Sequence, residues 1–254
     1  MAEPRHRSNS FRKLIIDNAW FGKNPLLWTA EHLDLLKIRF EHSKVILKIP
    51  CIYHNEHDPL FIFSKQFAEG LTPEMKTAAL QKMLGLLVKP LYLAYDKATF
   101  MFGGEDIHVS TCSVFTYGVS TMSKWSTVGY FHYEDVKWAR LQNSLPRANP
   151  GNGGNAPVAR VCRLRLRKVT PAEWTEDPYL VAMILLLVTT NQDPHDAHIF
   201  KAWIDLSLLE CLWNPALNFE GVVWPNIEHV VCPMQPYCTF PDRVALDLIG
   251  ERIY

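Results

Sequence analysis

The residues best suited to bind a metal ion lie in the segment CIYHNEHD, residues 51–58. Cys51, His54 and His57 follow one another at intervals of three residues, and two acids stand among them. Thiolate and imidazole groups are the usual ligands of tetrahedral zinc. A closed site needs a fourth ligand, and neither a C-x-x-C pair nor an H-E-x-x-H motif accompanies this segment. The pattern is therefore compatible with a zinc site or, more simply, with a polar turn between two strands.

A second group of imidazoles lies in the segment DPHDAH, residues 193–198. His195 and His198 alternate there with aspartates, and imidazole and carboxylate together can bind a divalent metal. The same letters also describe a helix start, with Asp193 as the N-cap and Pro194 at the first helical position. The two histidine groups could combine on one ion. We expect no other cofactor, and a divalent metal only if these groups converge.

Asp135 and Lys137 suggest a third kind of chemistry. On a strand, residues two apart point to the same face. An acid and a lysine arranged in this way occur in metal-dependent nucleases, where the acid binds Mg²⁺ and the lysine stabilises the charged transition state. Such an enzyme needs a further acid upstream, for which Asp106 is the available residue. Patterns of this length also arise by chance.

The elements that would position these residues indicate an α+β fold, because helical and alternating patterns are interspersed along the chain. A helix start at Thr72-Pro73-Glu74 and the Asp205 cap are the clearest local signals. Residues 179–188 are apolar throughout and fit either a buried helix or a strand. We expect helices over 30–40, 73–88, 206–213 and 241–253, and strands over 43–53, 60–63, 107–117, 128–133, 161–169, 198–204, 221–224, 229–231 and a pair formed by 91–95 with 99–102.

The segment VCRLRLRKV, residues 161–169, alternates apolar and basic residues, so we expect a strand with one apolar and one basic face. Arg163, Arg165 and Arg167 would form the basic face, which is the predicted partner surface. Residues 158–168 hold five positive charges and no acid, whereas residues 169–220 hold eight acids and one base. The net charge of zero for the whole chain therefore hides two segments of opposite sign.

A loop rich in proline, glycine and asparagine, residues 146–157, divides the chain. We expect a basic, disordered tail over residues 1–13, then an α+β domain or half-domain over 14–145. The loop acts as a linker, and a second α+β domain or half-domain follows over 158–254. One domain with a long internal loop fits the pattern equally well.

Composition excludes several classes of protein. With 48% hydrophobic and 20% charged residues, the chain is neither disordered nor low in complexity. The longest apolar run has about half the length of a membrane span, and no secretory signal precedes it. The six cysteines are too scattered for a disulfide scaffold. We therefore expect an intracellular protein, cytoplasmic or nuclear, that is not bound to a membrane.

Three phrases resemble a family of uncharacterised proteins from filamentous fungi: HYEDVKWA (132–139), LRLRKVTPAEWTEDPYLVA (164–182) and PYCTFPDRVALDLI (236–249). The resemblance covers about residues 128–254. It implies a fungal source and an intracellular setting, but no activity, cofactor or catalytic residue. The chain departs from the family after Ala182, where its apolar segment leads almost at once into residues 185–190.

The sequence favours a non-enzymatic interaction or regulatory protein, because no catalytic motif stands out. The alternative is a metal-dependent hydrolase or nuclease-like enzyme that uses Asp135 and Lys137 or one of the histidine groups. A protein partner or self-association fits the segregated charges. Balanced charge argues against a general nucleic-acid binder, although the basic strand and tail could contact phosphate.

Overall fold

The structure is a computed structural model. It describes residues 10–43, 54–87, 91–95, 98–102, 105–109, 112–118, 125–146, 155–185, 189–191 and 196–249. Within these residues the fold is α+β, as predicted, with helices on both sides of a mixed sheet. None of the described helices has both the length and the apolar character needed to cross a bilayer.

Seven strands form the main sheet, in the order β1-β9-β8-β7-β6-β5-β2. The β1–β9 and β6–β7 pairs are parallel and the others are antiparallel. The hairpin of β3 and β4 stands apart as a second sheet. The strands are β1 (Phe40–Ser43), β2 (Leu91–Tyr95), β3 (Ala98–Phe102), β4 (Glu105–Val109), β5 (Cys112–Gly118), β6 (Trp125–His132), β7 (Thr189–Asn191), β8 (Asp196–Lys201) and β9 (Ile227–Pro233).

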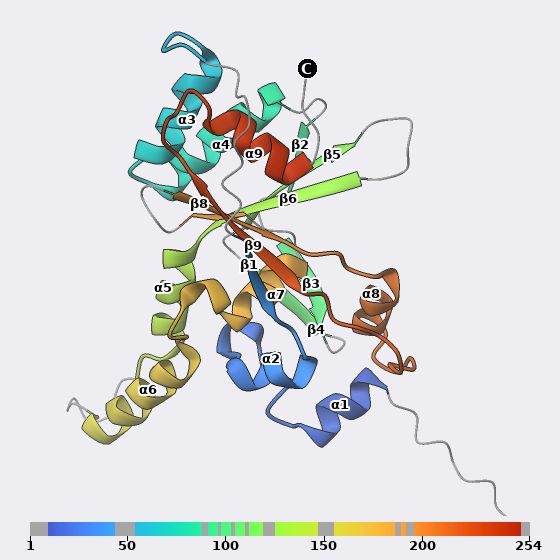
Figure 1. Cartoon of the computed structure of the whole chain (residues 1–254). Coiled ribbons are helices and arrows are strands. Elements are labelled where there is room, and N and C mark those ends of the chain that lie inside the picture. The colour runs from blue at the N-terminus through green and yellow to red at the C-terminus, as the bar shows by residue number, and fades with distance from the viewer. Residues whose placement is uncertain are drawn as a thin grey trace, which may run out of the picture.

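Two groups of helices enclose this sheet, as Figure 1 shows. On one face lie α3 (Pro59–Glu69), α4 (Pro73–Leu87) and α9 (Phe240–Ile249). On the other lie α1 (Phe11–Asp17), α2 (Ala30–Leu36), α7 (Pro178–Leu185) and α8 (Leu206–Trp213), with the short turns η1 (Pro25–Leu27) and η2 (Trp174–Glu176). α5 (Tyr133–Asn143) and α6 (Ala156–Val169) extend to one side.

Each face of the sheet has its own hydrophobic core, because neighbouring residues on a strand point to opposite faces. On β6, Tyr130 packs into the core below α3 and α4, whereas Phe131 packs into the core with α7 and α8. On β8, Ile199 and Phe200 divide in the same way. A central sheet with two separate cores therefore positions the helices on both of its faces.

Residues 11–13, expected in the disordered tail, form the start of α1, and two predicted strands are helices. Residues 60–63 belong to α3, which begins after Asp58, whose carboxylate accepts from Leu60 N at 2.8 Å. This carboxylate cap and the following proline are stronger local determinants than a run of four apolar residues. Residues 161–169 belong to α6, and residues 221–224 are not a strand. The strand over 107–117 is two strands, β4 and β5.

Other expectations agree with the structure. The helices over 73–88 and 206–213 are α4 and α8, and Asp205 caps α8 with a hydrogen bond of 2.8 Å from Ser207 N. Strands are present at 91–95 and 98–102, but they do not pair with each other, since β2 pairs with β5 and β3 with β4. The apolar run after Asp177 begins as α7.

The expected linker is shorter than predicted. Asn155 caps α6, and Ala156 and Pro157 form its first turn, so these three residues belong to a helix. Residues 147–154 lie outside the described residues, as do residues 44–53, which held most of one expected strand. Strands from before and after this loop lie side by side in one sheet, since β1 pairs with β9 and β6 with β7.

Candidate functional site

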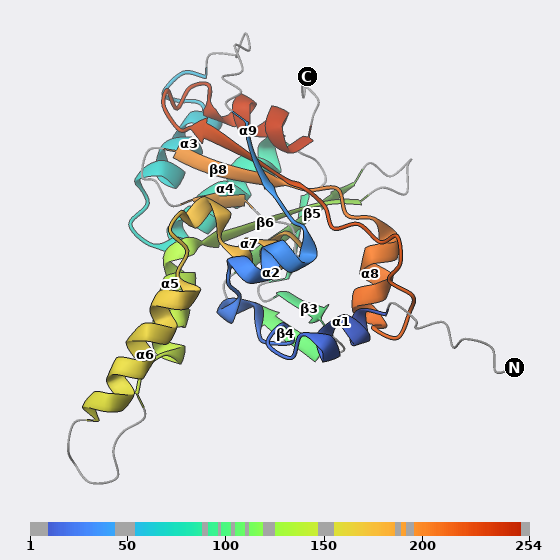
Figure 2. The same cartoon turned by 60° about the horizontal axis from the view of Figure 1, so that its bottom comes forward.

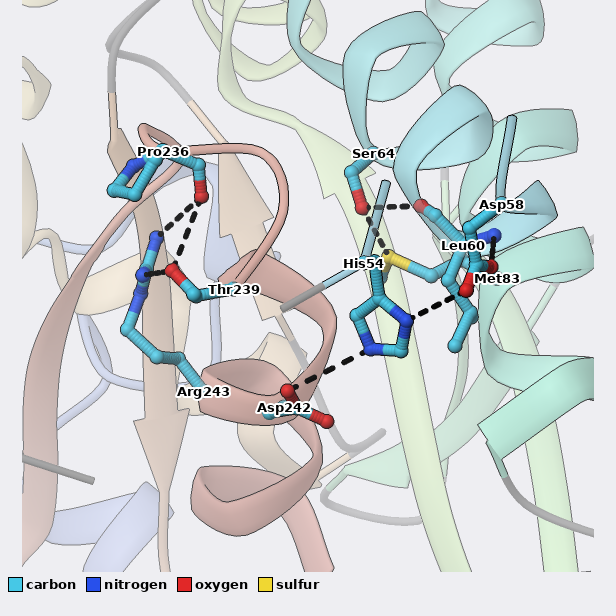
Figure 3. A network of polar contacts seen from close by, with 9 residues as sticks. All are labelled: His54, Asp58, Leu60, Ser64, Met83, Pro236, Thr239, Asp242 and Arg243. Carbon is cyan, nitrogen blue, oxygen red and sulfur yellow. Dashed lines mark hydrogen bonds and ion pairs between the residues drawn. The ribbon is translucent and has the colours of Figure 1, made fainter. Parts of the chain in front are cut away.

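His54 lies between two aspartates at the junction of α3 and α9 (Figure 3). Its Nδ1 donates to Asp58 Oδ2 at 2.8 Å, and its Nε2 is 3.6 Å from Asp242 Oδ2. Its backbone N–H donates to Cys238 O at 3.1 Å. Both ring nitrogens of this buried histidine therefore face carboxylates of the same chain, which ties α9 to the start of α3.

The loop that follows β9 is held just as firmly. The guanidinium of Arg243 donates to Pro233 O at 2.5 Å and to Gln235 O at 3.2 Å. It also donates to the Thr239 hydroxyl and contacts Pro236 O at 3.5 Å, as Figure 3 shows. A cavity of about 490 Å³ lies beside this loop, and His54, Phe61 and Tyr237 line it. Arg243 therefore holds the loop on one side of this cavity, and His54 lines it while its Nδ1 is bound to Asp58.

The predicted metal ligands that the structure describes do not assemble. His57 is exposed and its backbone N–H donates to Asn55 Oδ1, while Cys51 lies outside the described residues. His198 is on β8, where its neighbours Ala197 and Ile199 pack into the core shared with α3, so His198 itself points to the opposite face of the sheet. His195 lies outside the described residues. Among the residues that the structure describes, no group of three histidine, cysteine or acidic side chains could hold a metal ion.

His198 instead belongs to a row of three histidines across β8, β9 and β1. His198 Nδ1 is 3.0 Å from His229 Nε2, and His229 Nδ1 is 2.8 Å from His42 Nδ1. The row ends at Glu176, whose Oε1 accepts from His42 Nε2 at 3.0 Å. This contact leaves the neutral His42 ring with Nδ1 as an acceptor. His229 must then donate from Nδ1 and accept from His198, so one set of neutral tautomers satisfies the whole row.

The surroundings of His229 keep this ring uncharged. His229 stacks on Phe200 and on His198, and Trp174 packs edge-on against His198. Burial, with the neighbouring His198 and His42, lowers the pKa of His229 to about 4. His198 and His229 are buried, whereas His42 lies at the exposed end of the row.

Asp135 and Lys137 lie on a helix, α5, and not on a strand. Residues two apart on a helix do not face each other, so the predicted nuclease pair is wrong. Lys137 Nζ contacts Glu134 Oε1 at 2.7 Å instead. Burial raises the pKa of Asp135. Asp135 and Lys137 line one cavity of about 410 Å³, but the lysine pairs with Glu134 rather than with Asp135.

A buried ion pair fixes α5 to the rest of the fold. Arg140 and Asp177 are 2% and 0% exposed, and Arg140 Nη2 donates to Asp177 Oδ1 at 2.7 Å. The Tyr133 hydroxyl also donates to Asp177, and Arg140 Nε donates to Leu26 O at 2.9 Å. Asp177 Oδ1 in turn accepts from Tyr179 N at the start of α7. The charged groups of Arg140 and Asp177 are therefore bound to partners within the fold.

The three arginines of the predicted basic strand lie on α6. On a helix, Arg163 and Arg167 share one side and Arg165 points elsewhere, so the single basic face is wrong, although all three side chains are exposed. None of the 14 residues of α6 is buried. Its half-buried side is formed by Ala159, Cys162, Leu166 and Val169.

A second side of α6 combines apolar and basic groups. Val158, Val161 and Leu164 are 39%, 46% and 49% exposed. Arg165 is four residues from Val161 and lies on the same side. Within the described part of the chain, Arg165 makes no ion pair. We call Val158, Val161, Leu164 and Arg165 the α6 face.

α8 carries large apolar residues on two opposite sides. Leu208, Cys211 and Leu212 are buried against the core. The opposite side, at spacings of three and four, consists of Leu206, Leu209, Glu210 and Trp213. Trp213 is 73% exposed there. Large apolar side chains normally face the core rather than solvent on a helix, so this outer side is unusual on a protein surface.

Trp203, two residues before the Asp205 cap of α8, is also apolar and 96% exposed. Residues 202–228 contain four acids and no lysine, arginine or histidine. The outer surface of α8 is thus apolar and acidic. We call Trp203, Leu206, Leu209, Glu210 and Trp213 the α8 face.

Two of these arrangements escaped the sequence analysis. His42 and His229 are 187 residues apart and meet only because β1 and β9 pair in parallel with these residues in register. The α8 face had a visible signal, since the helix was predicted and both of its sides are apolar. Scans against family models and searches of curated proteins and solved structures gave no match to this chain.

Proposed function

We propose that the protein is a non-enzymatic intracellular interaction protein and that it binds a protein partner through the α8 face. One observation carries this proposal: α8 turns Leu206, Leu209 and Trp213 outward while a second apolar side packs inward. Large exposed apolar patches on soluble proteins mark binding sites. Tryptophan in particular is enriched among the residues that dominate binding energy.

The chemistry of the interior supports the same proposal. The histidines and the buried acids that could have formed a reactive site contact one another or the backbone. An enzyme instead leaves reactive groups aimed at a space for substrate. The metal-dependent hydrolase alternative rested on Asp135 and Lys137 or on one of the histidine groups, and the strand that would have set Asp135 and Lys137 on one face is a helix.

Site-specific photo-crosslinking in the full chain would test this proposal. A photoreactive phenylalanine analogue at position 213 should yield crosslinks to a protein in extracts of the cells that make the chain. The same analogue at position 71 is the matched control, because Leu71 is exposed but isolated between α3 and α4. The captured protein should then bind the purified chain, and Leu209→Glu should abolish that binding. Equal crosslinking from both positions, or none from position 213, would refute the proposal.

A further inference from the structure

α6 has too little packing to account for its own stability. Isolated helices of fewer than about 12–15 residues are marginal in water and depend on tertiary contacts. α6 has 14 residues, and none of them is buried. Its one described ion pair, Lys168 Nζ to Glu31 Oε2 at 3.5 Å, joins two exposed side chains, and such pairs contribute little. A contact on the α6 face would supply what the fold itself does not.

The α6 and α8 faces are both apolar sides of helices, and the segments that carry them have opposite charges. Each is one side of a helix with three exposed apolar residues at spacings of three or four. The α6 segment carries five positive charges over 158–168 and no acid, whereas the α8 segment carries acids and no base over 202–228. Apolar centres with opposite charges at their margins are the arrangement that interfaces favour.

The two faces cannot meet within one molecule. Figures 1 and 2, related by a turn about the horizontal axis, both place α6 at the left and α8 at the right. Figure 2 also shows α6 projecting from the body. The partner of each face must therefore be a different molecule.

We infer that the α8 face of one copy of this chain binds the α6 face of a second copy, head to tail. The inference rests on the proposed function, because it names the partner of the α8 face. Two different surfaces in contact make a heterologous interface, which propagates into a ring or an open chain of subunits. Glu210 of one copy would pair with Arg165 of the next, and Trp213 and Leu209 would pack between Val158 and Leu164.

Residues 1–9 are the other occupant within reach, because Ser10 bridges to Asn218 beyond the end of α8. Their sequence, MAEPRHRSN, offers Met1 and Ala2 as its only residues of the AVILMFWYC class. That is too little to cover two tryptophans and two leucines. The second copy supplies both the apolar residues and the positive charge.

Sedimentation of the full chain over a wide range of concentrations tests the inference. The wild type should associate reversibly, and high salt should weaken the association because exposed charges are screened. Val161→Glu and Leu209→Glu should each weaken it by at least about tenfold, since each places a charge in the apolar centre of the contact. Leu71→Glu, at an exposed site away from both faces, is the control and should associate like the wild type.

Mixing distinguishes a head-to-tail contact from a symmetric one. The Val161→Glu chain keeps its α8 face and the Leu209→Glu chain keeps its α6 face, so an equimolar mixture should form a one-to-one pair that does not grow. Arg165→Glu and Glu210→Arg should each weaken association, and the two together in one chain should restore it. An interface that pairs a face with itself would show neither behaviour.

Three results would overturn the inference: a wild type that stays monomeric at every concentration, association that survives Val161→Glu or Leu209→Glu, and crosslinks from position 213 to residues 1–9 of the same chain. The first two leave the proposed function intact if position 213 still captures another protein. Loss of every crosslink from position 213 would defeat both.

Discussion

Arg140 and Asp177 are almost completely buried, whereas Trp203 and Trp213 are 96% and 73% exposed. This is the reverse of the usual distribution, in which charged residues are rarely buried and large apolar ones rarely stand alone in water. The two charged groups of this ion pair have their partners within the chain. The exposed tryptophans, with Leu206 and Leu209, have no comparable apolar surroundings in the described structure.

The contrast separates the buried charged residues, which stabilise the fold, from the exposed apolar residues, which are available to bind a partner. A buried charge with a complete set of partners can be explained by stability alone, so it gives no reason to propose a reactive site. An exposed apolar stripe on a helix that is apolar on its other side as well has no such explanation. The predictions below test this separation, from changes inside the protein to changes on its surface.

The largest effect should follow from breaking the buried ion pair. Asp177→Ala leaves the Arg140 guanidinium buried without its carboxylate and removes the hydrogen-bond acceptor of Tyr133. Loss of one partner of a buried pair destabilises a protein by about 3–5 kcal/mol. Urea unfolding followed by circular dichroism measures this change.

Replacement of both partners is the control for the buried pair. Asn at position 177 keeps an oxygen for Tyr179 N, and Met at position 140 fills the apolar space without a charge. The double variant Arg140→Met with Asp177→Asn should recover much of the loss, since no charge is then left uncompensated. A double variant that is as unstable as Asp177→Ala would mean that the pair does more than neutralise two buried charges.

His54→Ala should have the next largest effect. It removes the donor to Asp58 and leaves the carboxylate of Asp242 facing an empty space. The expected loss in unfolding free energy is about 1–3 kcal/mol, the cost of an unsatisfied buried polar group. His57→Ala, three residues away and exposed, should change stability by no more than about 0.5 kcal/mol. If the two variants lose equal stability, His54 does not join α9 to α3 as described.

Acidification should destabilise the protein through its buried histidines. The pKa values of His229 and His32 are both lowered to about 4, chiefly by burial, from an unfolded value near 6.5. Between these two values the unfolded chain binds more protons than the folded one, so stability falls as the pH falls from about 6.5 to about 4. Above 6.5 neither histidine contributes a dependence on pH.

Thermal melting in this interval measures that loss. His229→Gln removes one of the two groups, so its melting temperature should fall less between these pH values than that of the wild type, whatever its absolute stability. A slope equal to that of the wild type would show that His229 is not the titrating group.

The sequence predicted a helix or strand correctly where the residues that determine it are neighbours in the chain. The Asp205 cap, eight consecutive helix-forming residues and a stop at Asn214-Pro215 were enough to predict the bounds of α8. The alternation of Arg163 to Arg167 was misleading, because arginine and leucine are both strong helix formers. An alternation of basic and apolar residues over five positions indicates a strand only if the segment can pair with a neighbouring strand. No described strand pairs with the residues of α6.

The candidate sites were less predictable than the elements. The row from His198 to His42 depends on three strands from the two ends of the chain, and Arg140 meets Asp177 across 37 residues. No spacing rule connects such positions. The α8 face, in contrast, was implicit in the prediction of α8, since a helix with Leu208 and Leu212 inside must turn Leu209 and Trp213 outward.

The smallest change in stability is expected on the α8 face, and it is the most direct test of the comparison. Leu209→Ala removes an exposed side chain, so the unfolding free energy of the dilute, unassociated protein should change by no more than about 0.5 kcal/mol. Leu212→Ala is the matched control: it makes the same chemical change on the buried side of the same helix, three residues later. It should destabilise the protein by about 2–5 kcal/mol through the cavity it leaves. Because both substitutions have the same effect on helix propensity, the difference between them measures burial alone. An equal loss from both would mean that the outer side of α8 is already covered in the single chain. The contrast between the buried, fully paired charges of Arg140 and Asp177 and an exposed apolar surface would then no longer hold.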